Sequence, residues 1–114
     1  MVIVRHPMLV LPALLLLVWA QPAAGEGNPL RGKYTYQEYC ASCHGSKGDG
    51  RGLYADALDP KPMDFTEGEF HCCVTDRDLF EFITDGQEPM PSWSAILDSD
   101  RWDLIAYLHT LKKK

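Results

Sequence analysis

The spacing of apolar residues along the chain predicts short helices and no sheet. Residues 76–85 carry an apolar side made of Leu79, Phe80, Phe82 and Ile83, and residues 98–111 carry one made of Trp102, Ile105, Tyr107, Leu108 and Leu111. Most of these residues recur at intervals of three and four, as on one face of a helix. No alternating pattern of useful length predicts a strand. The expected fold class is therefore all-α.

Residues that typically start and stop helices predict an additional helix near the N-terminus and the two ends of the helix over residues 76–85. Asn28 followed by Pro29 predicts a helix start, with Asn at the N-cap and Pro at the first helical position. This helix can continue through residues 30–40. Thr75 and Gly86 are suited to cap and to end the helix that lies between them.

The connections between helices are rich in glycine and proline. Residues 45–52 are expected to form a loop, and residues 53–58 favour a short helical turn. Pro60 and Pro62 each lack a backbone donor, so residues 59–62 are expected to be extended.

The N-terminus has the layout of a secretory signal peptide. Residues 8–19 are apolar, follow Arg5, and precede small residues at 20–25 that suit cleavage. The apolar run is shorter than the ~18 residues expected of a membrane-spanning helix, so an uncleaved anchor is the weaker alternative. We expect residues 1–24 to be removed, which leaves one small domain over residues 25–114 without a membrane span. Such a protein would lie in the periplasm or be secreted.

The charge of the chain narrows the classes of partner. It has 11 Lys and Arg residues against 16 Asp and Glu residues, and only one basic residue, Arg5, precedes Gly25. An acidic domain argues against nucleic acid as a partner and suits docking to basic or mixed protein surfaces. Solubility alone explains the same charge equally well.

The run from Cys40 to His44, Cys-Ala-Ser-Cys-His, carries the candidate chemistry. A C-x-x-C-H run is the attachment site of a c-type haem. Two sulfurs three positions apart can each reach one vinyl group on the same porphyrin edge, and the next imidazole can then ligate the iron. Thiol redox chemistry and half of a zinc site are the alternatives for a C-x-x-C pair. Because haem is attached outside the cytoplasm, the signal peptide supports the haem interpretation, and we expect one covalently bound haem c.

A low-spin electron-transfer haem needs a second axial ligand, for which Met90 is the main candidate. Pro89 and Pro91 flank it and stiffen an extended loop that can hold the thioether in one place. A thioether suits reduced iron and raises the reduction potential. Met63 lies close after His44 in sequence and is interpreted as a packing residue, with iron ligation as the weaker alternative.

Two histidines offer further alternatives. His71 could ligate the iron in place of Met90, although a surface histidine is the more common explanation. His109 lies in the last turn of the C-terminal helix, where the helix dipole favours a cation, and is interpreted as structural.

Together these motifs resemble the class I c-type cytochromes of the small, bacterial-type monohaem group over residues 29–111. Gly32, Tyr36 and Cys40 repeat the family's Gly-x-x-x-aromatic-x-x-x-Cys approach to the haem, and residues 104–108 match its C-terminal helix. The resemblance implies a cytochrome c fold, in which short helices wrap around a covalently bound haem.

In that family the first and last helices cross, so Gly32 and Tyr36 would meet Leu104 and Tyr107. The glycine lets the two backbones approach, and the aromatic residues pack against each other.

The resemblance also implies the surroundings of the haem. Residues 48–65 resemble the loop that covers the proximal face, where the Pro60 carbonyl would accept the Nδ1 proton of His44. Trp93 would reach a haem propionate, with core packing as the alternative. Arg51 would pair with a propionate, with a solvated loop charge as the alternative.

Cys72 and Cys73 depart from the family pattern. Exported proteins rarely leave thiols free, but a disulfide between sequence neighbours closes a tight ring. The sequence leaves open a strained bridge between the two, an intermolecular bridge that would dimerise an otherwise monomeric protein, a pair of buried thiols, and a redox switch.

The motifs favour a single-electron carrier that is not an enzyme and docks briefly with a donor and an acceptor protein. A haem subunit of an oxidoreductase complex is one alternative, and a haem-based redox or gas sensor is another. No acid or base residue is expected around an open iron site, which disfavours catalysis by the chain itself.

Overall fold

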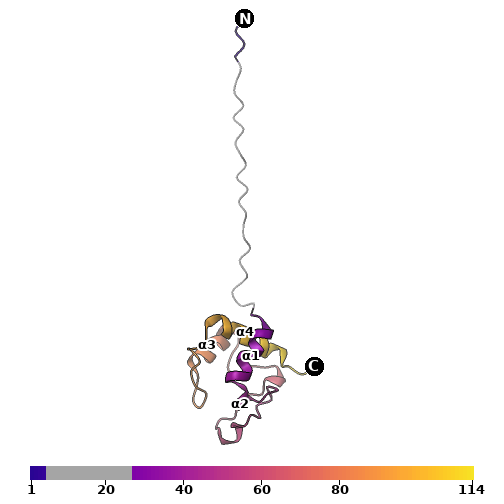
Figure 1. Ribbon diagram of the computed structural model, residues 1–114, viewed down its shortest axis with the longest axis vertical. Coiled ribbons are helices and arrows are strands. Elements are labelled where there is room, and N and C mark those ends of the chain that lie inside the picture. The colour runs from indigo at the N-terminus through magenta and orange to yellow at the C-terminus, as the bar shows by residue number, and fades with distance from the viewer. Residues whose placement is uncertain (5–26) are drawn as a thin grey trace.

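A computed structural model of the chain describes residues 1–4 and 27–114 (Figure 1). The α-helices of these segments are α1 (Pro29–Tyr39), α2 (Ala41–His44), α3 (Asp76–Asp85) and α4 (Asp98–Thr110), with 3-10 turns η1 (Ala55–Ala57) and η2 (Phe65–Glu67). Within the described segments there is no β-strand, and the all-α class is confirmed. Nor does any helix of these segments have the length and apolar character to cross a membrane. The expected signal peptide lies almost wholly in residues 5–26, outside the described residues.

The predicted helix starts are confirmed, because each depends on a local side chain. The Asn28 side chain accepts hydrogen bonds from two backbone amides of the first turn of α1. Thr75 and Asp78 form a capping box, in which each side chain accepts a hydrogen bond from the other's backbone amide. Gly86, with φ of +70°, ends α3 in a conformation that residues with a Cβ rarely adopt.

Helices α1 and α4 cross in close contact, as the family resemblance implied. A Cβ added to Gly32 would overlap the backbone oxygen of Asp103, so only glycine permits this approach. Tyr36 is fully buried beside the crossing, with its ring centroid 5.2 Å from that of Tyr107. Leu104 is buried in the same region, and the expected meeting of these residues is confirmed.

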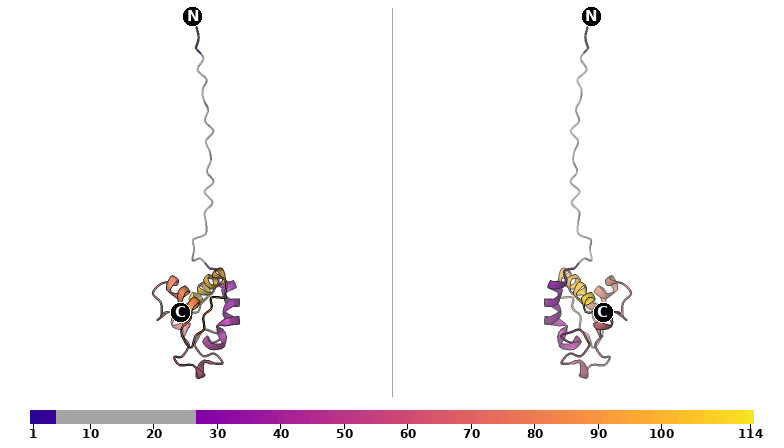
Figure 2. Two further views of the ribbon diagram at one scale, coloured as in Figure 1. Left: turned by 90° about the vertical axis from the view of Figure 1, so that its left-hand side faces the viewer. Right: turned by 90° about the vertical axis from the view of Figure 1, so that its right-hand side faces the viewer.

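Helix α3 lies on the other side of α4, so that α4 separates it from α1 (Figure 2). The core between these helices and η2 is formed by Tyr36, Phe65, Leu79, Phe80, Ile83, Leu104, Ile105 and Leu108. The extended segment that the prolines predicted runs up to η2, a turn that the sequence pattern did not indicate.

A buried carboxylate fastens the start of α1 to α4. Asp103 is 3% exposed. Its two oxygens accept hydrogen bonds from the backbone amide of Asn28 at 2.6 Å and from the Arg31 guanidinium at 2.6 and 3.2 Å. Burial opposes ionisation of Asp103, but the hydrogen bonds from Arg31 and Asn28 and the charge of Arg31 together hold the pKa of its carboxyl below the usual value.

We expect the D103N variant to lose about 2 kcal/mol of unfolding free energy at neutral pH, because a charged acceptor of three hydrogen bonds is removed. A lowered folded pKa stabilises the native state above the unfolded pKa of about 3.9, and this contribution fades as pH falls through the folded value. The difference between wild type and D103N should therefore shrink below about pH 4. Urea unfolding across pH measures it, with exposed Glu81→Gln as the control. A difference that persists undiminished in acid would contradict the ionic explanation.

Cys72 and Cys73 are joined to each other by a disulfide in the loop between η2 and α3. Of the alternatives that the sequence left open, the structure shows the bridge between neighbours. In this form neither sulfur is available for the intermolecular bridge that would dimerise the protein.

Candidate haem site

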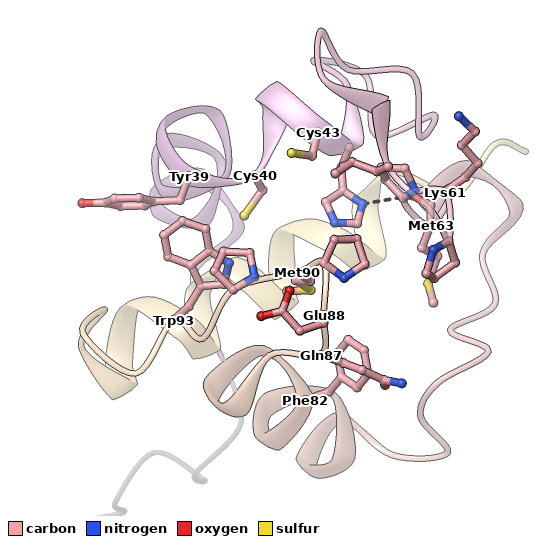
Figure 3. Close-up of a pocket in the computed structure, with 16 residues that line it drawn as sticks. Tyr39, Cys40, Cys43, Lys61, Met63, Phe82, Gln87, Glu88, Met90 and Trp93 are labelled. Atoms are coloured by element: carbon pink, nitrogen blue, oxygen red, sulfur yellow. Dashed lines mark hydrogen bonds between the residues drawn. The ribbon is translucent and has the colours of Figure 1, made fainter. Parts of the chain in front are cut away.

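A cavity of about 250 Å³ lies between the C-terminal end of α1, helix α2 and the loop that follows α3 (Figure 3). Its lining residues are Tyr39, Cys40, Cys43, His44, Leu58, Pro60, Lys61, Pro62, Met63, Phe82, Gln87, Glu88, Pro89, Met90, Pro91 and Trp93. Most of these side chains are apolar. The cavity therefore suits a largely apolar ligand, with a few sulfur and nitrogen atoms available to fix it.

The two cysteines of the motif face this cavity from one wall (Figure 3). Cys40 ends α1 and His44 ends the single turn of α2, where its amide donates to the Cys40 carbonyl at 2.9 Å. Tyr36 steadies this turn, because its hydroxyl donates to the Gly45 carbonyl at 2.6 Å. The helix end thus places both sulfurs and the imidazole at a single cavity.

The burial of the Cys40 thiol argues against thiol redox chemistry, and the described side chains around it do not complete a zinc site. Burial, with a smaller contribution from Cys43, raises the pKa of the Cys40 thiol to about 12, whereas thiols active in exchange have a lowered pKa. A complete zinc site needs three or four ligands, and among residues 1–4 and 27–114 no group of three or more His, Cys, Asp and Glu side chains could hold a metal ion, so a zinc site here would need ligands from elsewhere.

His44 is held in the tautomer that an iron ligand requires. Its Nδ1 lies 3.1 Å from the Met63 carbonyl oxygen, which can only accept, so Nδ1 carries the proton and Nε2 keeps its lone pair. Phe65 stacks on the ring with a centroid distance of 4.6 Å. Burial lowers the pKa of His44 despite the hydrogen bond to Met63, which favours the neutral imidazole.

The carbonyl that accepts this hydrogen bond differs from the expectation, which named Pro60. The Phe65 amide donates to the Gly48 carbonyl at 2.7 Å, and this bond draws the end of the extended segment behind the His44 ring. Met63 therefore reaches Nδ1, while Pro60 lines the cavity. The predicted role is filled, but by a residue three positions further along.

The structure separates the two candidate methionines. The backbone carbonyl of Met63 is bound to Nδ1, on the side of the imidazole away from the free Nε2, although Met63 also lines the cavity. Met90 comes from the loop between α3 and α4, where its amide donates to the Gln87 carbonyl at 2.8 Å, and it lies across the cavity from Cys40 and Cys43 (Figure 3). Met90 is thus a candidate second ligand for a haem bound in this cavity.

Neither alternative histidine lines the cavity. His71 is exposed and lies 3.8 Å from the Glu67 carboxylate. His109 Nε2 lies 2.7 Å from the Asp76 carboxylate, a contact that joins the end of α4 to the start of α3. The structural interpretation of His109 agrees with this contact.

Of the residues expected around a haem, Trp93 lines the cavity and Arg51 does not. The Trp93 ring packs against Tyr39 with a centroid distance of 5.4 Å. Arg51 is exposed in the glycine-rich loop, which agrees with the alternative of a solvated charge. Tyr39 and Phe82 also line the cavity, although the sequence had placed Phe82 only on the apolar side of residues 76–85 and had not singled out Tyr39. The available signals were the adjacency of Tyr39 to Cys40 and the apolar side that carries Phe82.

Arg101 is a supporting residue that the sequence did not indicate. It is 4% exposed, and its guanidinium donates to the carbonyls of Trp93, Ser94 and Ile96 and pairs with Asp98 at 2.5 Å. These bonds fasten the chain that follows the Met90 loop to α4. Arg101 thus holds in place the segment that brings Trp93 to the cavity.

We expect Arg101→Met to cost about 3 kcal/mol of unfolding free energy, because several buried carbonyls lose a charged donor. Arg77→Met is the matched control, since the Arg77 guanidinium lies over the same Phe80 ring, at 5.4 Å, but at the protein surface. The control should lose no more than about 1 kcal/mol. Thermal and urea unfolding measure both, and equal losses would show that the aromatic contact, not the carbonyl bonds, stabilises the loop.

Comparison with known proteins decides the family. The family described as "Cytochrome C oxidase, cbb3-type, subunit III" matches residues 27–108, which include the whole motif and Met90. The chain belongs to this family of c-type cytochromes. A c-type cytochrome holds haem covalently and transfers electrons, and the cavity with its two sulfurs and free imidazole nitrogen fits such a haem.

A solved structure supports the same assignment. This c-type cytochrome is similar to a chain of the Kuenenia stuttgartiensis reducing HAO-like protein complex Kustc0457/Kustc0458, with a TM-score of 0.68 and 30% sequence identity. The match covers 77% of this chain and 44% of that chain, so the cytochrome spans less than half of the solved chain's length. No match was found among curated proteins.

Proposed function

We propose that this c-type cytochrome is an exported single-electron carrier with one haem. Cys40 and Cys43 form the thioether bonds, and His44 and Met90 are the axial ligands. The observation that supports this proposal best is the convergence of all four side chains on one largely apolar cavity, with His44 fixed so that Nε2 is free.

The haem supplies a single-electron couple, between ferric and ferrous iron. The residues of the chain hold the two proposed iron ligands in fixed positions. The Met63 carbonyl orients His44, while Pro89 and Pro91 restrict the segment that carries Met90. Because both ligands are held before any electron moves, little rearrangement of the protein opposes transfer in either direction.

The proposal extends to partners and location. The acidic charge of the chain suits brief docking with donor and acceptor proteins that present basic or mixed surfaces. The apolar run near the N-terminus, followed by small residues, supports export to the periplasm or beyond.

A second candidate is a haem subunit of an oxidoreductase complex. Two observations favour it: the description of the matching family names an oxidase subunit, and the similar solved chain belongs to a protein complex. The native mass of the protein isolated under mild conditions separates the candidates. A carrier elutes near its own mass, and a subunit elutes with further chains.

We expect the mature holoprotein to gain the mass of one haem, and its ferrous form to resist carbon monoxide because Met90 occupies the sixth position. The Cys40→Ala/Cys43→Ala variant should lack the haem and lose much of its helix content, since the small domain would be left without the centre of its core. Mass spectrometry, carbon monoxide difference spectra and circular dichroism measure these properties, with Ser42→Ala as the control within the motif. A colourless mature protein, or rapid carbon monoxide binding, would overturn the proposal.

A further inference from the structure

The Cys72–Cys73 disulfide has no part in the proposed carrier and is a poor structural cross-link. A disulfide stabilises a fold mainly by closing a loop in the unfolded chain, and the effect grows with loop length. Between sequence neighbours no intervening residue is enclosed, so this stabilisation is close to nil. Both cysteines also lie in the same loop, so the bond joins no separate elements.

The position of the pair suits exchange with an external thiol. Cys72 is exposed, whereas Cys73 is half-buried and packs against the hydrophobic core. Thiol–disulfide exchange depends on which sulfur an attacking thiolate can reach. The sulfur of the exposed residue Cys72 is therefore the one that an external thiolate can attack, and the Cys73 sulfur is the leaving group.

The pair also touches the candidate haem site. Cys72 lines a small cavity of about 40 Å³ together with His44, Met63 and Met90. Those residues comprise both proposed axial ligands and the acceptor that orients one of them. Cys72 is thus accessible to solvent and also lines a cavity beside the proposed iron ligands.

We propose that Cys72–Cys73 is a second redox site of the protein, a two-electron disulfide/dithiol couple that a dithiol partner reduces and that alters the haem site. The thiol–disulfide exchange is independent of the proposed electron-carrier function, whereas the effect on the haem rests on that proposed function.

The exchange balances in two steps. A thiolate of the external dithiol attacks the Cys72 sulfur, the bond to Cys73 breaks, and Cys73 leaves as a thiolate that takes up a proton. The second thiol of the dithiol then attacks the mixed disulfide, and Cys72 is released and protonated. The external dithiol is oxidised to a disulfide by two electrons, and the pair gains two electrons and two protons.

The effect on the haem site follows from the shared cavity wall. Once the bond is broken, the two sulfurs are no longer held together and each carries a hydrogen. The wall that Cys72 contributes beside Met90 then changes shape. A change of packing around an axial ligand is expected to shift the absorption of the haem.

The first test uses the folded holoprotein with dithiothreitol as the probe, followed by iodoacetamide and mass spectrometry, with circular dichroism to show that the fold persists. We expect a gain of two alkyl groups, and none in the Cys72→Ser/Cys73→Ser variant. No uptake before denaturant is added would overturn the proposal. Uptake of four groups would show that Cys40 and Cys43 are also free, which overturns haem attachment but leaves the exchange site standing.

The second test addresses coupling. The ferrous holoprotein is treated with dithiothreitol, so that the charge of the iron stays the same throughout. We expect a shift of the haem absorption in the wild type and no shift in the Cys72→Ser/Cys73→Ser variant. An unchanged wild-type spectrum after full reduction of the disulfide would overturn the coupling.

Discussion

The Met90→Ala variant should lose the iron–thioether charge-transfer band and bind carbon monoxide readily in the ferrous state. Met90 lies across the cavity from the haem-motif cysteines, and His44, whose Nε2 keeps its lone pair, lines the same cavity. Thioether ligation raises the reduction potential, so we expect the potential to fall by on the order of 0.2 V, a part of the ~0.8 V range that axial ligands span. Optical spectra measure the charge-transfer band and carbon monoxide binding, and a redox titration measures the potential.

Met63→Ala is the matched control for this experiment. Both methionines line the same cavity, but Met63 contributes its backbone carbonyl to His44, and the substitution keeps that carbonyl. We expect this variant to retain the charge-transfer band and most of the potential. Loss of the band in Met63→Ala, with its retention in Met90→Ala, would reverse the ligand assignment.

Gly32→Ala should be among the most destabilising single substitutions in the domain, with a loss of about 3 kcal/mol. The added Cβ would overlap the backbone of Asp103, and a backbone atom cannot move aside as a flexible side chain can. Helices α1 and α4 would have to separate. That separation would disturb Tyr36, whose hydroxyl steadies the turn after the haem motif.

Urea unfolding of the holoprotein measures this loss. Lys33→Ala, at the next position of α1 but exposed, should change stability by less than about 0.5 kcal/mol. If Gly32→Ala were as mild as this control, the close crossing of the helices would be wrong.

Local side-chain chemistry explains which parts of the fold the sequence could predict. Asn28 and Thr75 cap helices through bonds to amides a few residues away, so a short stretch of sequence contains the whole interaction. The same is true of Cys40, Cys43 and His44, whose spacing within one helical turn places them together.

The interactions that the sequence could not predict are non-local. The acceptor for His44 is a backbone carbonyl, which every residue has, so only the path of the folded chain selects Met63 over Pro60. Arg101 has the sequence context of a surface charge on α4, and its burial depends on carbonyls of a loop that precedes the helix. The bond between Cys72 and Cys73 is the exception, because it joins sequence neighbours, yet composition alone left other states of the pair open.

Because the acceptor for His44 is a main-chain carbonyl, mutagenesis has limited means to alter this proposed iron ligand. An alanine scan of residues 60–65 leaves every carbonyl in place, so it cannot remove the hydrogen bond that makes the imidazole a stronger electron donor. The strength of that bond can be tuned only by moving the segment, for example through the contact of Phe65 with Gly48. A change in the length of this loop is thus expected to alter the reduction potential while the proposed ligands stay the same.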